Sequence, residues 1–270
     1  MEKPTPSGDA AAASLPRQAV VYRRYLRLQA VAAQRFSGEL AGRLVLSVGF
    51  NLEGAELALA TTIAGGVFLG IEASPEKLKA AVRNGSCDFM VNTLDESLRV
   101  LKNELRKHTP LSAGLLGDAA TILAEMVERG VQPDLIAESP LEIAESPLER
   151  VQDALRTLAR RGAEVLPLPG VDPAPHEVVW TAANPHDFRR MDRSALESIP
   201  LEDVVRHRWL QQAPGNFYRQ TPLAGVIDLE PEELARLRAA LQADGAIRPF
   251  QAPAMLRWKD SAGVQQTITL

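Results

Sequence analysis

The sequence predicts an α/β protein with a Rossmann-like parallel sheet that carries helices on both faces, plus a smaller mixed α/β second region. Three observations predict this class. Short apolar runs alternate with helical patterns from residue 43 to residue 136. The runs are continuously apolar, which is typical of strands buried on both faces of a sheet. The first run ends in a turn between Gly49 and Gly54 that leads directly into a helix.

The elements follow one another in a regular order along this part of the chain. Helices are expected at about residues 18–35, 54–65, 94–107 and 118–129, and another begins at Pro75, which suits the first turn of a helix. Strands are expected at residues 43–48, 67–71, 87–91, 111–116 and 134–136. Since helices separate the strands, the strands are expected to be parallel.

The chain is expected to divide into three parts. Residues 1–16 are rich in Ala, Pro and Ser and are expected to be disordered. Residues 40–165 form the Rossmann-like domain. Residues 17–39 and 166–270 form the second region, in which the N-terminal helix packs with the later elements. A Pro-rich linker is expected at residues 166–175, and the clearest later helices at about 186–197, 202–212 and 231–243.

A short exact duplication occurs in residues 137–150, where AESPLEI is followed at once by AESPLER. Two copies are too few for a solenoid. The duplication is interpreted as a slipped repeat in an exposed loop or at the start of a helix.

Composition excludes several classes of protein. The chain has 270 residues and a net charge of -4, and it contains no Lys/Arg cluster, so a nucleic-acid partner is not expected. It contains one cysteine, Cys87, which excludes an internal disulfide framework and zinc sites built on two or more thiolates. Neither a signal core nor a run of 18 apolar residues occurs, so no membrane association and a cytoplasmic location are expected.

The turn after the first strand is a weak version of a dinucleotide-binding turn. Such a turn has three glycines: the first makes the tight turn, the second admits the pyrophosphate, and the third allows close packing of helix on strand. Gly49 and Gly54 take the first and third places, but Asn51 takes the second. The motif alone therefore also fits a tight turn that binds no ligand.

The surrounding sequence resembles urocanase. The likeness rests on residues 36–46 (FSGELAGRLVL), 59–65 (LATTIAG), 69–72 (LGIE), 117–123 (GDAATIL), 127–134 (VERGVQPD), 199–200 (IP), 207–210 (HRWL) and 223–224 (LA). The similar segments span about residues 20–226. The resemblance implies a Rossmann-like NAD domain, and the family is a hydro-lyase of histidine metabolism that uses tightly held NAD as an electrophile.

The resemblance places six candidate cofactor-binding residues at the carboxyl ends of the strands. They are Gly49, Asn51, Gly54, Glu72, Gly117 and Asp118. Glu72 ends the second strand and has the position of an acid that binds the adenosine ribose, although an exposed charge at a strand end fits equally. Asp118 stands where the family has asparagine, and a helix N-cap is favoured over a ligand contact.

The phosphate turn departs from the family in ways that disfavour NAD. Asn51 and Leu52 replace paired glycines, Ala55 replaces another glycine, and Leu57 replaces a glutamine. Asn51 adopts positive φ more easily than most residues, which would keep the shape of the turn. Its side chain and that of Leu52 would nevertheless crowd a pyrophosphate, and Glu53 adds negative charge at the helix N-terminus. NAD is therefore a doubtful cofactor.

Parts of the family's active site have no counterpart in this sequence. The family's Gln-Thr-Ser-Ala-His run after the residues matching 133–134 is replaced by the duplicated segment, and Gly225 stands where the family has arginine. The active-site regions that the family has before residue 20 and after residue 226 also have no counterpart. No catalytic residue is assigned, because neither substrate-positioning groups nor an acid or base can be identified.

The other polar residues are expected to be structural. The four histidines have no metal-ligand spacing and are expected at the surface or in packing. Asp187 and Asp192 flank an arginine pair on a helix and are expected on a solvated face. Cys87 is expected to be a buried, inert thiol. Trp180, Trp209 and Trp258 are expected to anchor packing.

The sequence therefore favours a divergent urocanase-like protein without stand-alone urocanate hydratase activity and with a weakened or altered nucleotide site. The expected ligand is nucleoside-like rather than a dinucleotide, and a homodimer is compatible with the sequence. Three alternatives stay open: an active urocanate hydratase or other NAD-dependent enzyme, a non-catalytic scaffolding or partner subunit, and one half of a split hydratase.

Overall fold

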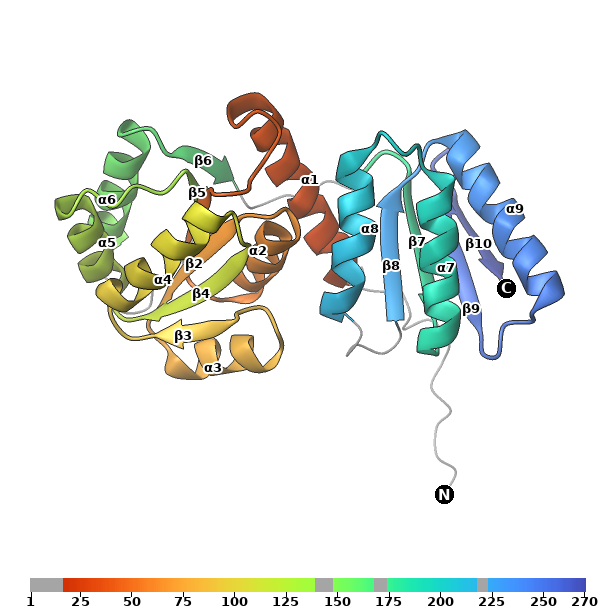
Figure 1. The fold of residues 1–270 in the computed structure, drawn as a ribbon, viewed down its shortest axis with the longest axis horizontal. Helices are drawn as coiled ribbons and strands as arrows, with labels where there is room; N and C mark the ends of the chain where they lie inside the picture. Colours follow the sequence, from red (N-terminus) through yellow and green to blue (C-terminus); the bar gives the residue numbers. More distant parts are fainter. Residues whose placement is uncertain (1–16, 139–147, 168–173, 218–222) are drawn as a thin grey trace, which may run out of the picture.

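The computed structural model describes residues 17–138, 148–167, 174–217 and 223–270. The expected disorder of residues 1–16 and the centre of the 137–150 duplication lie outside these residues. The described part consists of two sheets with their helices, and helix α1 lies between them (Figure 1). None of its helices is long and apolar enough to cross a membrane.

The first sheet is parallel throughout, as predicted. Its strand order is β3-β4-β2-β1-β5-β6. The strands are β1 Leu44–Val48, β2 Val67–Glu72, β3 Phe89–Val91, β4 Leu111–Leu116, β5 Leu135–Glu138 and β6 Glu164–Pro167. Without the short edge strand β3, the order is that of a Rossmann fold, and the direction of winding reverses between β1 and β5.

Helices cover both faces of this sheet. They are α2 Leu52–Ile63, α3 Pro75–Arg83, α4 Leu94–Lys107, α5 Ala119–Glu128 and α6 Leu148–Arg160. One core joins α2 and α3 to the face that carries Val45 and Phe68, and a second joins α4, α5 and α6 to the face that carries Leu46 and Leu69. Neighbouring residues of a strand point to opposite faces, so β1, β2 and β5 contribute to both cores, which explains their continuously apolar sequences.

The second sheet is antiparallel and has the order β10-β9-β7-β8. Its strands are β7 Glu177–Ala182, β8 Leu223–Asp228, β9 Ala254–Lys259 and β10 Gln265–Thr269. Its helices are α7 Pro185–Ser198, α8 Val204–Phe217 and α9 Pro231–Ile247. This sheet and its three helices form the mixed α/β second region that the sequence predicted.

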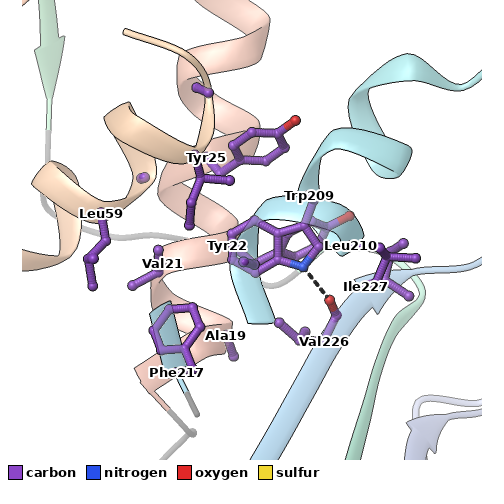
Figure 2. Packing of buried hydrophobic residues seen from close by; sticks show 14 of the residues in the cluster. Ala19, Val21, Tyr22, Tyr25, Leu59, Trp209, Leu210, Phe217, Val226 and Ile227 are labelled. Carbon is purple, nitrogen blue, oxygen red and sulfur yellow. Dashed lines mark hydrogen bonds between the residues drawn. The ribbon is translucent and has the colours of Figure 1, made fainter. Parts of the chain in front are cut away.

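Helix α1, Arg17–Arg35, contacts both units. It packs along α2 of the parallel-sheet unit and against β8 and α8 of the antiparallel-sheet unit. Tyr22 and Tyr25 are buried against Trp209, with ring centroids 4.8 and 5.3 Å from the indole (Figure 2). The Trp209 indole N–H donates to the carbonyl oxygen of Val226 at 2.7 Å, which confirms Trp209 as a packing anchor.

Two buried ion pairs hold α1 to both units. Arg24 pairs with Glu56 of α2 at 3.1 Å, and Arg23 binds Glu177 of β7 through two hydrogen bonds of 2.8 Å. All four side chains are less than a tenth exposed. Burying a charge is costly unless it is paired, so each pair restricts how α1 can dock.

The structure corrects several bounds that the sequence predicted: β3 begins at Phe89 rather than at residue 87, and α8 covers Val204–Phe217 rather than 202–212. Residues 166–167 end strand β6, which continues the parallel sheet beyond β5, so this part of the expected linker is a strand. Helix α2 begins at Leu52, two residues before the expected start at Gly54. The earlier start follows from the cap described below.

Candidate functional site

Hydrogen bonds bring the six predicted site residues to one edge of the parallel sheet. The turn after β1 is held to β2 by the Gly49 amide, which donates to the carbonyl oxygen of Ile71 at 2.7 Å. The turn after β4 is held to β2 by the Gly117 amide, which donates to the carbonyl oxygen of Glu72 at 3.0 Å. The three turns therefore form one connected rim at the carboxyl ends of β1, β2 and β4, where open α/β sheets bind ligands.

The two glycines that shape the turn after β1 have the roles that the sequence predicted. Gly49 has φ of +89°, a backbone conformation that residues other than glycine rarely adopt. A Cβ atom on Gly54 would lie 2.5 Å from the carbonyl oxygen of Gly49, so only glycine allows α2 to pack this closely on the turn.

Asn51 differs from the expectation that it would adopt positive φ. Its φ is -67°, and it is the N-cap of α2, with its side-chain oxygen accepting from the Gly54 amide at 3.0 Å. An N-cap residue has extended backbone and satisfies one of the free amides of the first turn. The Gly54 amide is therefore already engaged by the protein rather than free to bind a phosphate.

Two neighbours add to this effect at the start of α2. Leu52 is the first helical residue and is 68% exposed, so its side chain projects from the turn. Glu53 places a carboxylate in the first turn, where the helix dipole favours an anion. A pyrophosphate at this position would therefore meet both an apolar side chain and a like charge.

Glu72 has a structural role that the sequence did not reveal. One carboxylate oxygen accepts from the Phe50 amide at 2.8 Å, and the other accepts from the Ser74 amide at 3.0 Å. The residue is 7% exposed. Its side chain thus joins the turn after β1 to the turn after β2, and only a small part of the carboxylate surface is left to meet a ribose hydroxyl.

Phe50 and Ser74 are the members of this rim that sequence reasoning missed. The Phe50 ring packs on Phe68, and a Cβ atom on Gly70 would lie 2.5 Å from that ring. Ser74 caps α3 by accepting from the Lys77 amide at 3.3 Å. The signal for Ser74 was present in the sequence, since a serine before a proline at the helix start is a common cap.

Asp118 is the N-cap of α5, as favoured from the sequence. Its carboxylate accepts from the Thr121 amide at 2.8 Å and from the Thr121 hydroxyl at 2.7 Å. The preceding Gly117 has φ of +155°. Both residues thus have clear local roles at the start of α5.

A family model matches the first part of the chain. Residues 17–140 match the family model described as the urocanase Rossmann-like domain. This part of the chain is a urocanase-type Rossmann-like domain. The match includes α1, the turn after β1 and strands β1 to β5.

Two solved structures show weaker likeness to the chain. The crystal structure of AibC matches 59% of this chain and 40% of its own, with 14% sequence identity and a TM-score of 0.32. A universal stress protein in complex with cAMP matches 48% of this chain and 98% of its own, with 9% identity and a TM-score of 0.24. The chain thus spans less than half of AibC, and neither likeness is close enough to inform function.

Polar residues of the second unit differ from their predicted positions. Asp187 and Asp192 were expected on a solvated face, but Asp187 is fully buried and pairs with Arg190 at 3.0 Å. The Asp192 carboxylate accepts from the Trp180 indole N–H at 2.8 Å, and burial raises the pKa of this carboxyl to about 7. The Asp192 Oδ2 atom is buried without a hydrogen-bond partner.

A small cavity lies beside Asp192. Gln18 of α1, Trp180, Asp192 and Gly225 are among its lining residues, and about 10 Å³ is open to the centre of a water molecule, which is on the order of one water. The Gln18 side-chain nitrogen is also buried without a partner. A Cβ atom on Gly225 would lie 2.2 Å from the Trp180 ring, so the indole fills the space of a side chain there.

Cys87 is buried, as the sequence predicted, and burial raises the pKa of its thiol to about 11. The thiol is therefore poorly suited to act as a nucleophile. Among the described residues, no group of three His, Cys, Asp or Glu could hold a metal ion.

Proposed function

We propose that this protein is a urocanase-like nucleoside-binding protein that does not hydrate urocanate by itself. The single observation that carries the proposal is the cap of α2. Asn51, at the place of the glycine that admits the pyrophosphate, uses its side chain to accept from the Gly54 amide in the first turn of α2, so this amide is not free for a phosphate. With Leu52 and Glu53 beside it, the turn does not fit the pyrophosphate of NAD.

The proposal keeps the rim as a ligand site but changes the ligand. Glu72 still presents a carboxylate at the end of β2, and a ribose diol can donate to an oxygen that already accepts one amide, since each carboxylate oxygen has two lone pairs. An uncharged or singly charged nucleoside avoids the pyrophosphate position. We therefore expect adenosine and similar nucleosides to bind before NAD.

Two further observations support the loss of hydratase activity. The resemblance to urocanase implies an arginine at position 225, and here Trp180 fills that space over Gly225. The resemblance also implies a polar Gln-Thr-Ser-Ala-His run after β5, where this chain has the AESPLE repeats. Groups that would position substrate in the family are thus replaced.

Titration calorimetry with NAD, AMP and adenosine tests the proposal. We expect NAD to bind with a dissociation constant weaker than about 1 μM, which corresponds to about -8 kcal/mol. The double variant Asn51→Gly with Leu52→Gly should bind NAD at least tenfold more tightly, because it frees the Gly54 amide and removes an apolar side chain. Thr93→Gly removes the matching cap of α4 and should leave NAD binding unchanged.

Two results would contradict the proposal. Tight NAD binding by the natural sequence would show that the capped turn accepts pyrophosphate. Loss of urocanate absorbance catalysed by the pure protein with added NAD, above a heat-inactivated control, would show that hydratase activity is retained.

A further inference from the structure

A groove at the opposite end of the parallel sheet has no role in the proposed nucleoside site. Its volume is about 610 Å³. One wall is formed by segments that precede β1, β2 and β4, including Gly65 and His108, and the other wall is formed by α8 with His207 and Arg208. The groove thus lies between the two units, at the amino ends of the strands.

Missing Cβ atoms make room for two of its polar side chains. Gly65 has φ of +90°, and a Cβ atom there would lie 2.5 Å from a guanidinium nitrogen of Arg208. Gly42 has φ of +74°, and a Cβ atom there would lie 3.0 Å from the His108 ring. Arg208 also donates to the carbonyl oxygen of Ala64 at 3.2 Å, which places the guanidinium over the end of α2. The backbone around both side chains is therefore shaped to receive them.

The polar lining of the groove favours an anion. None of its lining residues is Asp or Glu, and the polar ones are Thr62, His108, His207, Arg208, Gln211 and Gln212. Arg208 makes no ion pair with any carboxylate in the part of the chain that the structure describes. An arginine without a carboxylate partner in a groove is well suited to bind a carboxylate of a ligand.

The groove also has an apolar part. Leu201 and Val204 line it and are 85% and 65% exposed. Large aliphatic side chains this exposed gain free energy when a ligand covers them. The volume lies in the range of sites for small organic molecules, which is about 300–1,000 Å³.

We propose that this groove binds a small organic carboxylate with an apolar chain. The carboxylate lies on the Arg208 guanidinium, with the side-chain amides of Gln211 and Gln212 as further donors, and the apolar chain lies on Leu201 and Val204. This site is separate from the rim at the carboxyl ends of the strands.

Ligand-observed NMR and calorimetry with octanoate and 1-octanol test the charge requirement. These probes share an alkyl chain and differ in the anionic group. We expect octanoate to bind with a dissociation constant of about 1 mM or tighter, and 1-octanol to bind at least tenfold more weakly. Arg208→Gln should weaken octanoate binding at least tenfold, and Arg208→Lys should restore part of it.

Matched variants separate binding from folding. Arg236→Gln is the control for charge, because Arg236 also donates to a backbone carbonyl and makes no ion pair within the described residues. Leu201→Gln changes a side chain that is 85% exposed, and it should weaken octanoate binding severalfold while leaving acetate binding unchanged. Its control is Ile247→Gln, at a residue of α9 that is 78% exposed, which should change the binding of neither probe. The Leu201 pair keeps the test informative if Arg208→Gln does not fold.

Three outcomes would overturn the proposal. These are no octanoate binding at millimolar concentration, equal binding of octanoate and 1-octanol, and octanoate binding that neither the Arg208→Gln nor the Leu201→Gln protein weakens. Binding of octanoate that both variants weaken, with both controls unchanged, supports it.

Discussion

The rim at the carboxyl ends of the parallel strands and the surroundings of α8 differ in how their polar side chains are hydrogen-bonded. At the rim, Asn51, Glu72 and Asp118 each accept hydrogen bonds from backbone amides of the turns beside them. Around α8, Arg208 has no carboxylate partner among the described residues, and Asp192 Oδ2 is buried without a hydrogen bond. The three polar side chains of the rim are thus engaged by the turns beside them, whereas around α8 a guanidinium has no carboxylate partner and a carboxylate oxygen has no hydrogen bond within the described residues.

The comparison distinguishes positions of the turn that the backbone restricts to one residue type from positions that it does not restrict. The backbone requires both glycines that shape the turn, because Gly49 has positive φ and a Cβ atom on Gly54 would lie 2.5 Å from the Gly49 carbonyl oxygen. A position that only admits a ligand has no such constraint and can acquire a cap instead. The following predictions test how strictly this division applies, beginning with the largest expected effect.

The largest effect is expected for the buried carboxyl beside α8. The pKa of Asp192 is raised from 3.8 to about 7, so the folded protein holds a proton that the unfolded chain releases. Its contribution to stability is complete below about pH 4 and is lost as pH rises toward 7. Across this range, the free energy of unfolding of the natural protein should fall by up to about 4 kcal/mol relative to that of the Asp192→Asn protein.

Urea unfolding at several pH values measures this difference. Asp153→Asn, at an exposed carboxylate on α6, is the control and should give no comparable trend. A difference in free energy of unfolding between the Asp192→Asn and natural proteins that stays constant from pH 4 to pH 8 would mean that the carboxyl is not protonated in the folded protein.

The second effect concerns the backbone of the rim. Gly54→Ala places a Cβ atom 2.5 Å from the Gly49 carbonyl oxygen and should reduce the free energy of unfolding by about 1–3 kcal/mol. Gly215→Ala is the control, because its Cβ atom would meet open space in α8 and should stabilise the helix by up to about 1 kcal/mol. Equal effects of the two substitutions would mean that the turn relaxes without cost.

The third effect concerns the link between two turns. Glu72→Gln leaves one of the two amides, the buried one of Phe50 or the part-buried one of Ser74, without an acceptor and should reduce the free energy of unfolding by about 1–3 kcal/mol. Glu128→Gln, at an exposed residue of α5, should be close to neutral in thermal unfolding. If Glu72→Gln does not change the stability, the carboxylate is not needed to link the two turns, and ribose binding would be the only role left for Glu72.

The smallest effect is expected for the cap. Asn51→Ala should cost about 1 kcal/mol in thermal unfolding, since it removes the side-chain acceptor of the Gly54 amide. Thr93→Ala removes the equivalent cap of α4 and should cost a similar amount. A stabilising Asn51→Ala substitution would show that Asn51 was retained for a ligand and not for the helix.

The sequence by itself determined the parallel-sheet unit and its turns. Strand β4 at Leu111–Leu116 and helix α4 at Leu94–Lys107 have the predicted bounds, and the roles of Gly49 and Gly54 were also predicted. These features depend on local patterns, namely apolar runs, helix caps and the permitted φ of glycine, which a short stretch of sequence contains in full.

Only the tertiary structure decided the positions of the buried charges and of the groove. Asp192 has the sequence context of a surface helix, and its burial depends on Trp180 from β7 and on Gln18 from α1. The groove joins Gly65 and His108 to Arg208, which are far apart in the chain. Contacts of this kind depend on how α1 and α8 dock between two sheets, and a local pattern of residue types carries no information about that docking.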